Sequence, residues 1–340
     1  MDGEGICDEE EGIYNPYIIT NDHELQAVLE DLDGCYAIEN NIDVSGTNNW
    51  YDGAGFDPVN NFDGELYGSN YDIRGLYVDR PEMDNVGLIG DSQGYIENIR
   101  LSEVDITGNE NVGGFMGLND NHAVIENAYA SGTIEGETNV GGLIGRNNQH
   151  AEVTNSYSDG LVIGTENVGG LLGVNREQGN ITQSYSSGTI FGDENVGGLL
   201  GENRNNADIL DSYASGTISG DYNVGGLIGK NNNQGNVDTS YASSIISGED
   251  NVGGLIGNEN GVIEDSYWDV DTTGIEEEEE TSGGPGGGPG GGDGGGEGLS
   301  NDEITGETAE SNLDGFDFEN VWMTTENGHP ILIDNNELEE

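Results

Sequence analysis

A repeat of 28 residues runs through the centre of this sequence and constrains its fold more than any other feature. The stretch at 139–145, Asn-Val-Gly-Gly-Leu-Ile-Gly, returns with small changes at 28-residue steps. Its other copies begin at Asn111, Asn167, Asn195, Asn223 and Asn251, and a shorter copy begins at Asn85. A fixed period of about 20 to 50 residues is typical of solenoids, propellers and repeat arrays.

Each repeat holds three short apolar runs, such as 140–144, 153–157 and 161–163, separated by Gly- and Asn-rich sequence. Runs of this length that are rich in Ile, Val, Thr and Tyr indicate strands. Such strands bury an apolar face only if neighbouring coils stack as parallel strands about 4.8 Å apart. We therefore predict an all-β parallel β-helix, or solenoid, with about three strands per coil and short capping helices at both ends. A propeller blade takes about 40 residues or more, which disfavours that alternative.

The repeated Gly-Gly and Asn residues each have a structural explanation. Gly allows a sharp turn or a close approach between coils. Asn tolerates the left-handed backbone region, and stacked Asn side chains can bond one another from coil to coil. A phosphate-binding loop is disfavoured because the sequence contains neither of the usual glycine patterns. Five regular coils with one or two degenerate ones would span roughly 30 Å.

The stretch 141–145, Gly-Gly-Leu-Ile-Gly, followed by Asn155-Ser156-Tyr157-Ser158, resembles the GLUG-motif repeat. The segments 55–64, 73–76, 267–269 and 315–322 resemble the first and last parts of such proteins. The resemblance implies a secreted or cell-surface, adhesin-like repeat protein. GLUG repeats also occur in non-catalytic parts of immunoglobulin A1-specific metalloendopeptidases. Function inferred from a shared fold remains an analogy.

The changes in composition along the chain predict six segments. They are an acidic disordered leader at 1–12, an N-terminal capping helix region at 13–35, irregular first coils at 36–110, regular GLUG-type repeats at 111–275, a Glu/Gly-rich flexible linker at 276–297 and a C-terminal cap segment at 298–340. Asn21 with Glu24, and Ser300 with Glu303, have the spacing of helix caps. We expect Trp50, Tyr51 and Phe56 to fill the entry of the core.

The charge is strongly one-sided, with 67 acidic and 7 basic residues and a formal net charge of −60. Such a chain repels nucleic acid and anionic lipid. At about 1 M salt the Debye length is about 3 Å, so self-repulsion is largely screened. We therefore expect a halophilic protein. Neutralisation by calcium is the alternative, although no EF-hand or β-roll calcium loop is present.

Two sets of residues are candidates for ligand binding. The first is the basic set that follows the Gly-Leu-Ile-Gly strands, which would line one edge of the solenoid: Arg146, Arg176, Arg204 and Lys230. These cations could bond sugar hydroxyls or carboxylates, or they could simply relieve acidic repulsion in exposed turns. The second set is a ladder of tyrosines: Tyr129, Tyr157, Tyr185, Tyr213 and Tyr241. A ladder that faces outward would suit sugar rings. However, each tyrosine lies four positions after an aliphatic residue, and strict alternation along a strand would place both on the same face, which favours the core.

The sequence shows no catalytic constellation and implies no cofactor. His23-Glu24 begins a zinc-protease motif that fails at Ala27, where the second histidine is needed. His122 and His150 lie 28 residues apart and could approach one another, but no third metal ligand is evident. Cys7 and Cys35 could form a bridge or remain free thiols.

These features favour a non-enzymatic extracellular or cell-surface protein for adhesion, or for binding polysaccharide or protein in high salt. A rigid spacer and a polysaccharide lyase or hydrolase are the alternatives. We expect a monomer with no nucleic acid partner and no direct membrane insertion. No signal peptide or transmembrane stretch is visible in the sequence.

Overall fold

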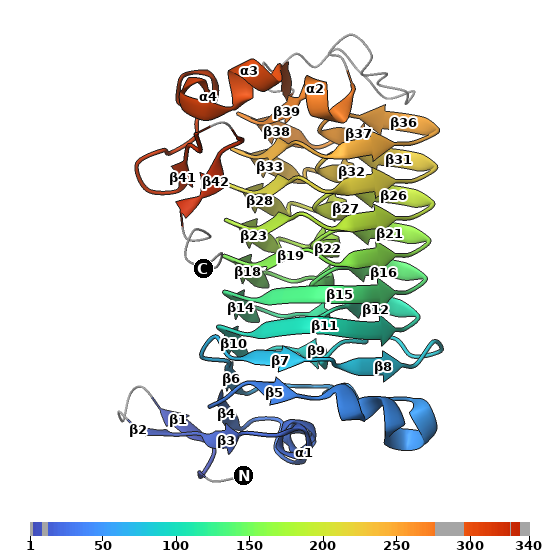
Figure 1. Cartoon of the computed structure of the whole chain (residues 1–340), viewed down its shortest axis with the longest axis vertical. Helices are drawn as coiled ribbons and strands as arrows, with labels where there is room; N and C mark the ends of the chain where they lie inside the picture. Colours follow the sequence, from blue (N-terminus) through green and yellow to red (C-terminus); the bar gives the residue numbers. More distant parts are fainter. Residues whose placement is uncertain (1–2, 9–12, 276–295, 327, 334–340) are drawn as a thin grey trace.

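The computed structural model describes residues 3–8, 13–275, 296–326 and 328–333, and it shows a tall stack of coils (Figure 1). Neighbouring coils pair as parallel strands in register, so that Val153 lies opposite Ile125 on one side and Ile181 on the other. Four sheets run along the stack. This arrangement confirms the predicted all-β parallel solenoid.

Two of these sheets contain the strands that begin each coil. The ten-stranded sheet consists of β3 (Tyr17–Ile19), β4 (Cys35–Ile38), β6 (Glu65–Tyr67), β10 (Tyr95–Glu97), β14 (Val124–Glu126), β18 (Glu152–Thr154), β23 (Asn180–Thr182), β28 (Asp208–Leu210), β33 (Asn236–Asp238) and β38 (Val262–Glu264). The fifteen-stranded sheet consists of β5 (Ile42–Asp43), β7 (Asp72–Arg74), β8 (Tyr77–Asp79), β11 (Arg100–Thr107), β15 (Tyr129–Glu135), β19 (Tyr157–Ser158), β20 (Leu161–Ile163), β24 (Tyr185–Ser186), β25 (Thr189–Phe191), β29 (Tyr213–Ala214), β30 (Thr217–Ser219), β34 (Tyr241–Ala242), β35 (Ile245–Ser247), β39 (Tyr267–Asp269) and β40 (Glu297–Leu299).

The other two sheets contain the strands of the repeated Asn-Val-Gly-Gly-Leu-Ile-Gly stretch. The six-stranded sheet consists of β12 (Glu110–Gly113), β16 (Thr138–Gly141), β21 (Glu166–Gly169), β26 (Glu194–Gly197), β31 (Tyr222–Gly225) and β36 (Asp250–Gly253). The seven-stranded sheet consists of β9 (Ile89–Ser92), β13 (Met116–Asn119), β17 (Ile144–Asn147), β22 (Leu172–Arg176), β27 (Leu200–Arg204), β32 (Ile228–Asn232) and β37 (Ile256–Glu259).

The strand count per coil differs from the expected three. The coil that starts at Glu152 contains five strands, from β18 to β22. Two predicted runs are divided because the chain turns inside them, at Asn155 in one and between Gly169 and Leu172 in the other. The stack is also longer than the roughly 30 Å expected. At about 4.8 Å per strand, ten strands span roughly 43 Å, because the irregular coils stack as full coils.

The repeated asparagines form the predicted ladder. Asn139 has a left-handed backbone with φ of 55°, and its side chain is 7% exposed. Its Nδ2 donates to Asn111 Oδ1 at 2.8 Å, and its own Oδ1 accepts from Asn167 Nδ2 at 3.0 Å. A second buried ladder runs through Asn147 and Asn175, whose side chains bond at 2.9 Å. These bonds satisfy polar groups that would otherwise be costly to bury.

The Gly-Gly pair allows a close approach between chain segments. A Cβ atom on Gly141 would lie 2.1 Å from the carbonyl oxygen of Ile144, and one on Gly142 would lie 2.1 Å from that of Gly170. Any side chain at these positions would therefore collide with backbone. Neither glycine has a left-handed φ, whereas Asn139, inside β16, does.

The N-terminal end is capped by short elements. Helix α1 (Asp22–Gln26) begins at Asn21, whose Oδ1 accepts from the Glu24 backbone N–H at 3.0 Å, and it continues as the 3₁₀ helix η1 (Ala27–Glu30). Leu25 and Val28 are buried against the first coils. A second 3₁₀ helix, η2 (Ser45–Gly53), follows β5.

The segment expected to be a disordered leader contains a strand among its described residues. Strand β1 (Ile6–Asp8) pairs antiparallel with β2 (Ile13–Asn15), and Cys7 forms a disulfide with Cys35 of β4. The two thiols therefore form a bridge, one of the two alternatives left open by the sequence. The disulfide joins the hairpin to the ten-stranded sheet.

The C-terminal end carries helix α2 (Val270–Thr273) and a segment that we call the C-terminal cover, which comprises residues 297–326 and 328–333. The cover begins with β40, continues through α3 (Asn301–Ile304) and α4 (Gly306–Asn312), and ends in the β41 (Trp322–Met323) and β42 (Ile331–Leu332) hairpin. The predicted capping box is present, since the Ser300 N–H donates to Glu303 Oε2 at 3.0 Å. Figure 1 shows α3 and α4 above the last coil and β41–β42 beside the stack.

Most of the predicted linker at 276–297 lies outside the described residues. Within the part of the chain that the structure describes, no helix has the length and apolar character needed to span a membrane.

Candidate functional site

The structure places the four predicted basic residues together on the seven-stranded sheet, and we call them the basic patch. Arg146 and Lys230 occupy the same register position in β17 and β32, while Arg176 and Arg204 are paired directly in β22 and β27. Each residue comes from a different consecutive coil. The cations stack along the solenoid as predicted, but they lie within the strands and not in the exposed turns after them, and ligand binding by them stays a prediction.

The cationic side chains of the basic patch are partly buried. The side chain of Arg146 is 18% exposed and that of Arg176 is 24% exposed. Burial, followed by repulsion from Arg176, lowers the pKa of Arg146. Like charges directly opposite on neighbouring strands are destabilising, as for Arg176 and Arg204. An anion placed between these guanidinium groups would relieve that repulsion.

Each cation of the basic patch has a carboxylate within 4 Å, and Arg146 lies 3.7 Å from Glu110 while Arg176 lies 3.8 Å from Glu177. Glu202, with a side chain only 5% exposed, lies 3.0 Å from Arg204 and 3.8 Å from Lys230. Arg176 Nε donates to Asn148 Oδ1 at 3.1 Å. Among the described residues, the buried Nε atoms of Arg146 and Arg204 have no hydrogen-bond partner. Those two N–H groups are inaccessible to solvent, so an anionic or hydroxylated ligand would have to meet the exposed parts of the side chains, which are 18% exposed for Arg146 and 32% for Arg204. The repeat pattern did not predict that Glu202 lies within the basic patch.

The tyrosine ladder packs outside the central core of the solenoid, contrary to the preference for a core ladder, yet Tyr157, Tyr213 and Tyr241 are buried there. Ile125 and Ala130 are fully buried and point inward, whereas Tyr129 between them remains partly exposed. Asn127 has a left-handed φ of 53°, and this corner resets the alternation between β14 and β15. Side chains alternate between the inner and outer face only along a continuous strand, so the face of Ile125 does not predict the face of Tyr129 beyond the corner.

The ladder rings stack on one another over consecutive coils. Tyr157 and Tyr185 lie 4.8 Å apart between ring centroids with an angle of 3°, and Tyr213 and Tyr241 lie 5.1 Å apart at 2°. At the N-terminal end, Arg100 lies 4.5 Å from the centroid of Tyr129 and donates to Tyr157 Oη at 2.9 Å. Burial raises the pKa of Tyr129 to about 12.

The C-terminal cover buries the other end of the ladder. Trp322 is fully buried against Tyr213 and Tyr241, and its indole N–H donates to Asp211 at 3.3 Å. The expected closure of the C-terminal end is therefore accompanied by packing along the side of the solenoid. As a result, Tyr241 is only 1% exposed and cannot contact a ligand while the cover is in place.

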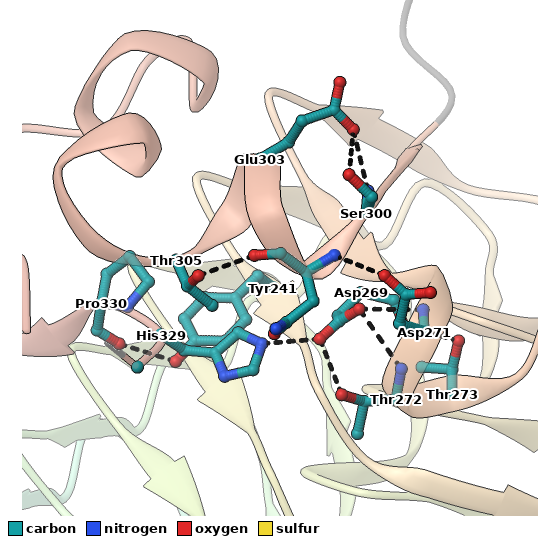
Figure 2. Close-up of polar contacts among 12 residues, drawn as sticks. Tyr241, Asp269, Asp271, Thr272, Thr273, Ser300, Glu303, Thr305, His329 and Pro330 are labelled. Carbon is teal, nitrogen blue, oxygen red and sulfur yellow. Dashed lines mark hydrogen bonds and ion pairs between the residues drawn. The ribbon is translucent and has the colours of Figure 1, made fainter. Parts of the chain in front are cut away.

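A polar cluster fastens the cover to the last coil, as Figure 2 shows. His329 Nε2 lies 2.9 Å from Asp269 Oδ2, and Tyr241 Oη donates to the Pro330 carbonyl oxygen at 2.7 Å. Asp269 also caps α2, accepting from the Asp271 N–H at 2.9 Å and from Thr272 Oγ1 at 2.7 Å. Burial raises the pKa of Asp269, but the bonds from His329 and Thr272 outweigh it and leave that pKa lowered. Sequence gave no signal for this pair, because its members lie 60 residues apart.

The other chemical candidates do not form a reactive or metal-binding site. The His122 and His150 rings stack at 4.9 Å between centroids with an angle of 4°. Among the described residues, three potential metal ligands lie close together at Cys7, Cys35 and Glu65, and both cysteines form the disulfide. The two histidines thus lack a third ligand in the part of the chain that the structure covers.

Comparison with known proteins supports the repeat architecture. The sequence matches the family described as the GLUG motif over residues 108–135, 136–163 and 192–219. A region of 113 residues is 34% identical to Halomucin of Haloquadratum walsbyi, and it spans 31% of this chain but 1% of Halomucin.

A solved structure with a similar fold matches almost the whole of this chain. A Bacteroides ovatus protein provisionally assigned as an immunoglobulin A1 protease gives a TM-score of 0.60 at 18% identity, covering 94% of this chain and 93% of that one. A structure named IgA1 Protease gives a TM-score of 0.44 at 20% identity, covering 74% of this chain and 19% of that one. Similarity at such identity concerns the fold alone. The chain is thus a parallel β-solenoid that carries GLUG-motif repeats in its regular coils.

Proposed function

We propose that this solenoid is a non-catalytic, extracellular surface module that binds an acidic polysaccharide through the basic patch in high salt. The observation that carries the proposal is the concentration of four of the seven basic residues on one sheet of a chain with net charge −60. Elsewhere on such a surface, carboxylate or sulfate groups would be repelled. The basic patch is therefore the place where an acidic sugar chain would meet cations.

High salt does not remove this kind of binding. At about 1 M salt, long-range attraction is screened within about 3 Å, so only groups in direct contact contribute. Partly buried guanidinium groups make short, directional and charge-assisted bonds to carboxylates and sulfates. The local similarity to Halomucin of Haloquadratum walsbyi agrees with the high-salt setting that the acidic composition predicts.

A rigid spacer is the second candidate, and the ladders of the core favour it. The Asn side chains bond from coil to coil between Asn111 and Asn251, which makes each coil support its neighbours. A stiff rod would hold its two ends at a fixed distance whether or not it binds a ligand. The alternative of a lyase or hydrolase has no specific observation in its favour, because the basic patch pairs its one buried carboxylate with cations.

The test is a binding titration of the full chain in 1 M KCl. The probes are polygalacturonate and dextran sulfate, with neutral dextran as the uncharged comparison. We expect saturable binding of the anionic polymers and at least a tenfold loss in the triple variant Arg176→Ser, Arg204→Ser, Lys230→Ser.

The matched control is Arg74→Ser, which removes an arginine that lies outside the basic patch and pairs with Glu103. Binding should be unchanged in that variant. Equal binding of neutral dextran, or full retention of binding in the triple variant with an intact circular dichroism spectrum, would leave the spacer function as the better account.

A further inference from the structure

A groove at the N-terminal end lies between the α1–η1 segment and η2, away from the basic patch and the tyrosine ladder. Its volume is about 520 Å³, and it is lined by His23, Leu29, Glu30, Trp50 and Tyr51, among others. Pockets of a few hundred cubic ångströms with aromatic walls and a few polar groups are typical of small-molecule sites.

Tyr51 is held at this groove in an unfavourable backbone conformation. Its φ is 49°, and Asp52 follows with φ of 59°. The sequence predicted that Tyr51 fills the core, but its side chain is 58% exposed while Phe56 is fully buried. Left-handed backbone is rare for aromatic residues, and such strain clusters at functional sites. The fold thus keeps an exposed aromatic ring in place at a conformational cost.

The walls of the groove are fixed by specific contacts. The Gln26 side-chain amide donates to the Asp57 carbonyl oxygen and accepts from the Asp57 N–H, both at 2.9 Å, which ties α1 to the chain after η2. Arg80 lies 5.7 Å from the Tyr51 ring centroid and 3.1 Å from the Asp57 carboxylate. A site whose walls are already ordered loses less entropy when a ligand binds.

The aromatic wall is continuous, and polar groups stand at its rim. The His23 ring stacks on Trp50 at 5.2 Å, and Trp50 packs on Phe56 at 6.4 Å. Among the described residues, neither the Trp50 indole N–H nor the Glu30 carboxylate makes a hydrogen bond. One donor and one strong acceptor therefore accompany the exposed ring of Tyr51.

These features point to a particular class of ligand. A pyranose ring has an apolar C–H face that packs on an aromatic side chain, and hydroxyls at its edge that bond carboxylates and N–H groups. Glu30 lines the groove and Asp22 and Asp52 are sequence neighbours of lining residues, so carboxylates outnumber the Arg80 cation at the Tyr51 ring, which disfavours an anionic sugar. We propose that the groove is a binding site for a neutral pyranose, with its C–H face on Tyr51 and its hydroxyls toward Glu30 and the Trp50 N–H. This proposal does not depend on the basic patch.

Tryptophan fluorescence can test the proposal directly. Trp268 and Trp322 are fully buried, whereas Trp50 is partly exposed in the groove. The full chain would be titrated with the methyl glycosides of glucose, galactose and mannose, and with glucuronate as the anionic comparison. We expect saturable fluorescence changes with at least one neutral sugar, weaker binding of glucuronate, and loss of the signal in Trp50→Phe.

The decisive variant is Tyr51→Gly, because glycine adopts left-handed backbone readily. We expect at least a tenfold loss of sugar affinity, measured by calorimetry, with a Tm that is unchanged or higher. Tyr51→Asn is the second variant, since asparagine also tolerates this backbone. Tyr222→Ala is the matched control, because Tyr222 is 50% exposed on the distant strand β31 and should not affect binding.

Three outcomes would overturn the assignment. One is the absence of saturable binding by every neutral sugar. Another is undiminished affinity in folded Tyr51→Gly or Tyr51→Asn. The third is binding of glucuronate as tight as that of the neutral sugars, because the acidic rim would then have no influence.

Discussion

The regular coils and the C-terminal cover are stabilised in different ways. In the coils the same contact recurs, so the Asn139–Asn111 bond of 2.8 Å is repeated as the Asn223–Asn195 bond of 2.8 Å. In the cover each contact occurs once and joins distant parts of the chain, as Trp322 joins Asp211 across 111 residues.

This difference has a thermodynamic consequence. A solenoid is stabilised by interactions within each coil and between neighbours, so a defect in one coil weakens the coils on both sides. The cover contacts the last coils and the outer tyrosines, and no other coil depends on it. Changes in the coils should therefore disturb the whole molecule, whereas changes in the cover should stay local.

The largest effect is expected for Gly141→Ala. The new methyl group would lie 2.1 Å from one backbone oxygen, of Ile144, and 2.7 Å from another, of Leu171 in the next coil. Backbone atoms cannot move aside as the end of a flexible side chain can. We therefore expect the free energy of unfolding to fall by more than about 4 kcal/mol. Thermal unfolding followed by circular dichroism measures this loss.

Gly46→Ala is the control for that prediction, because a Cβ atom at Gly46 meets nothing within 4 Å. Its Tm should match that of the parent. A Gly141→Ala protein with an unchanged Tm would show that close packing of the coils does not limit stability.

A smaller and more local effect is expected for Trp322→Ala. Removal of this fully buried ring from Tyr213, Tyr241 and Phe316 should destabilise the closed cover by about 3–5 kcal/mol. Hydrogen exchange should accelerate in β41, β42 and α4, while the amides of the regular coils remain protected. Equal acceleration in both regions would mean that cover and coils unfold as one unit.

The smallest effect concerns the pairing of Asp269 with His329. The lowered pKa of Asp269 means that its ionised form stabilises the folded protein above the unfolded value of about 3.9, and that this contribution is lost as the pH falls through the folded pKa. We expect Asp269→Asn to weaken the closed cover by about 1–2 kcal/mol near neutral pH. Asp269→Asn should also reduce the loss of stability of the closed cover that occurs as the pH falls.

Hydrogen exchange of β41 and β42 as a function of pH checks this expectation. Thr272→Val serves as a comparison, because it removes one bond to Asp269 but leaves His329 in place. An Asp269→Asn protein with the same acid response as the parent would assign that response to other carboxylates.

The sequence alone determined the repeat and everything that follows from its period. A spacing of 28 residues places equivalent residues in register, so the stacked strands, the asparagine ladder and the grouping of Arg146, Arg176, Arg204 and Lys230 could be predicted. The helix caps at Asn21 and Ser300 could also be predicted, because capping is a local interaction.

The tertiary structure alone decided which way the tyrosines face and what covers them. Left-handed corners such as Asn127 reset the inward–outward alternation, so parity along the sequence did not determine the face. The contacts of the cover and the position of Tyr51 join segments that have no fixed spacing. Periodicity specifies neighbours one coil apart, whereas contacts that occur only once depend on the path of the whole chain.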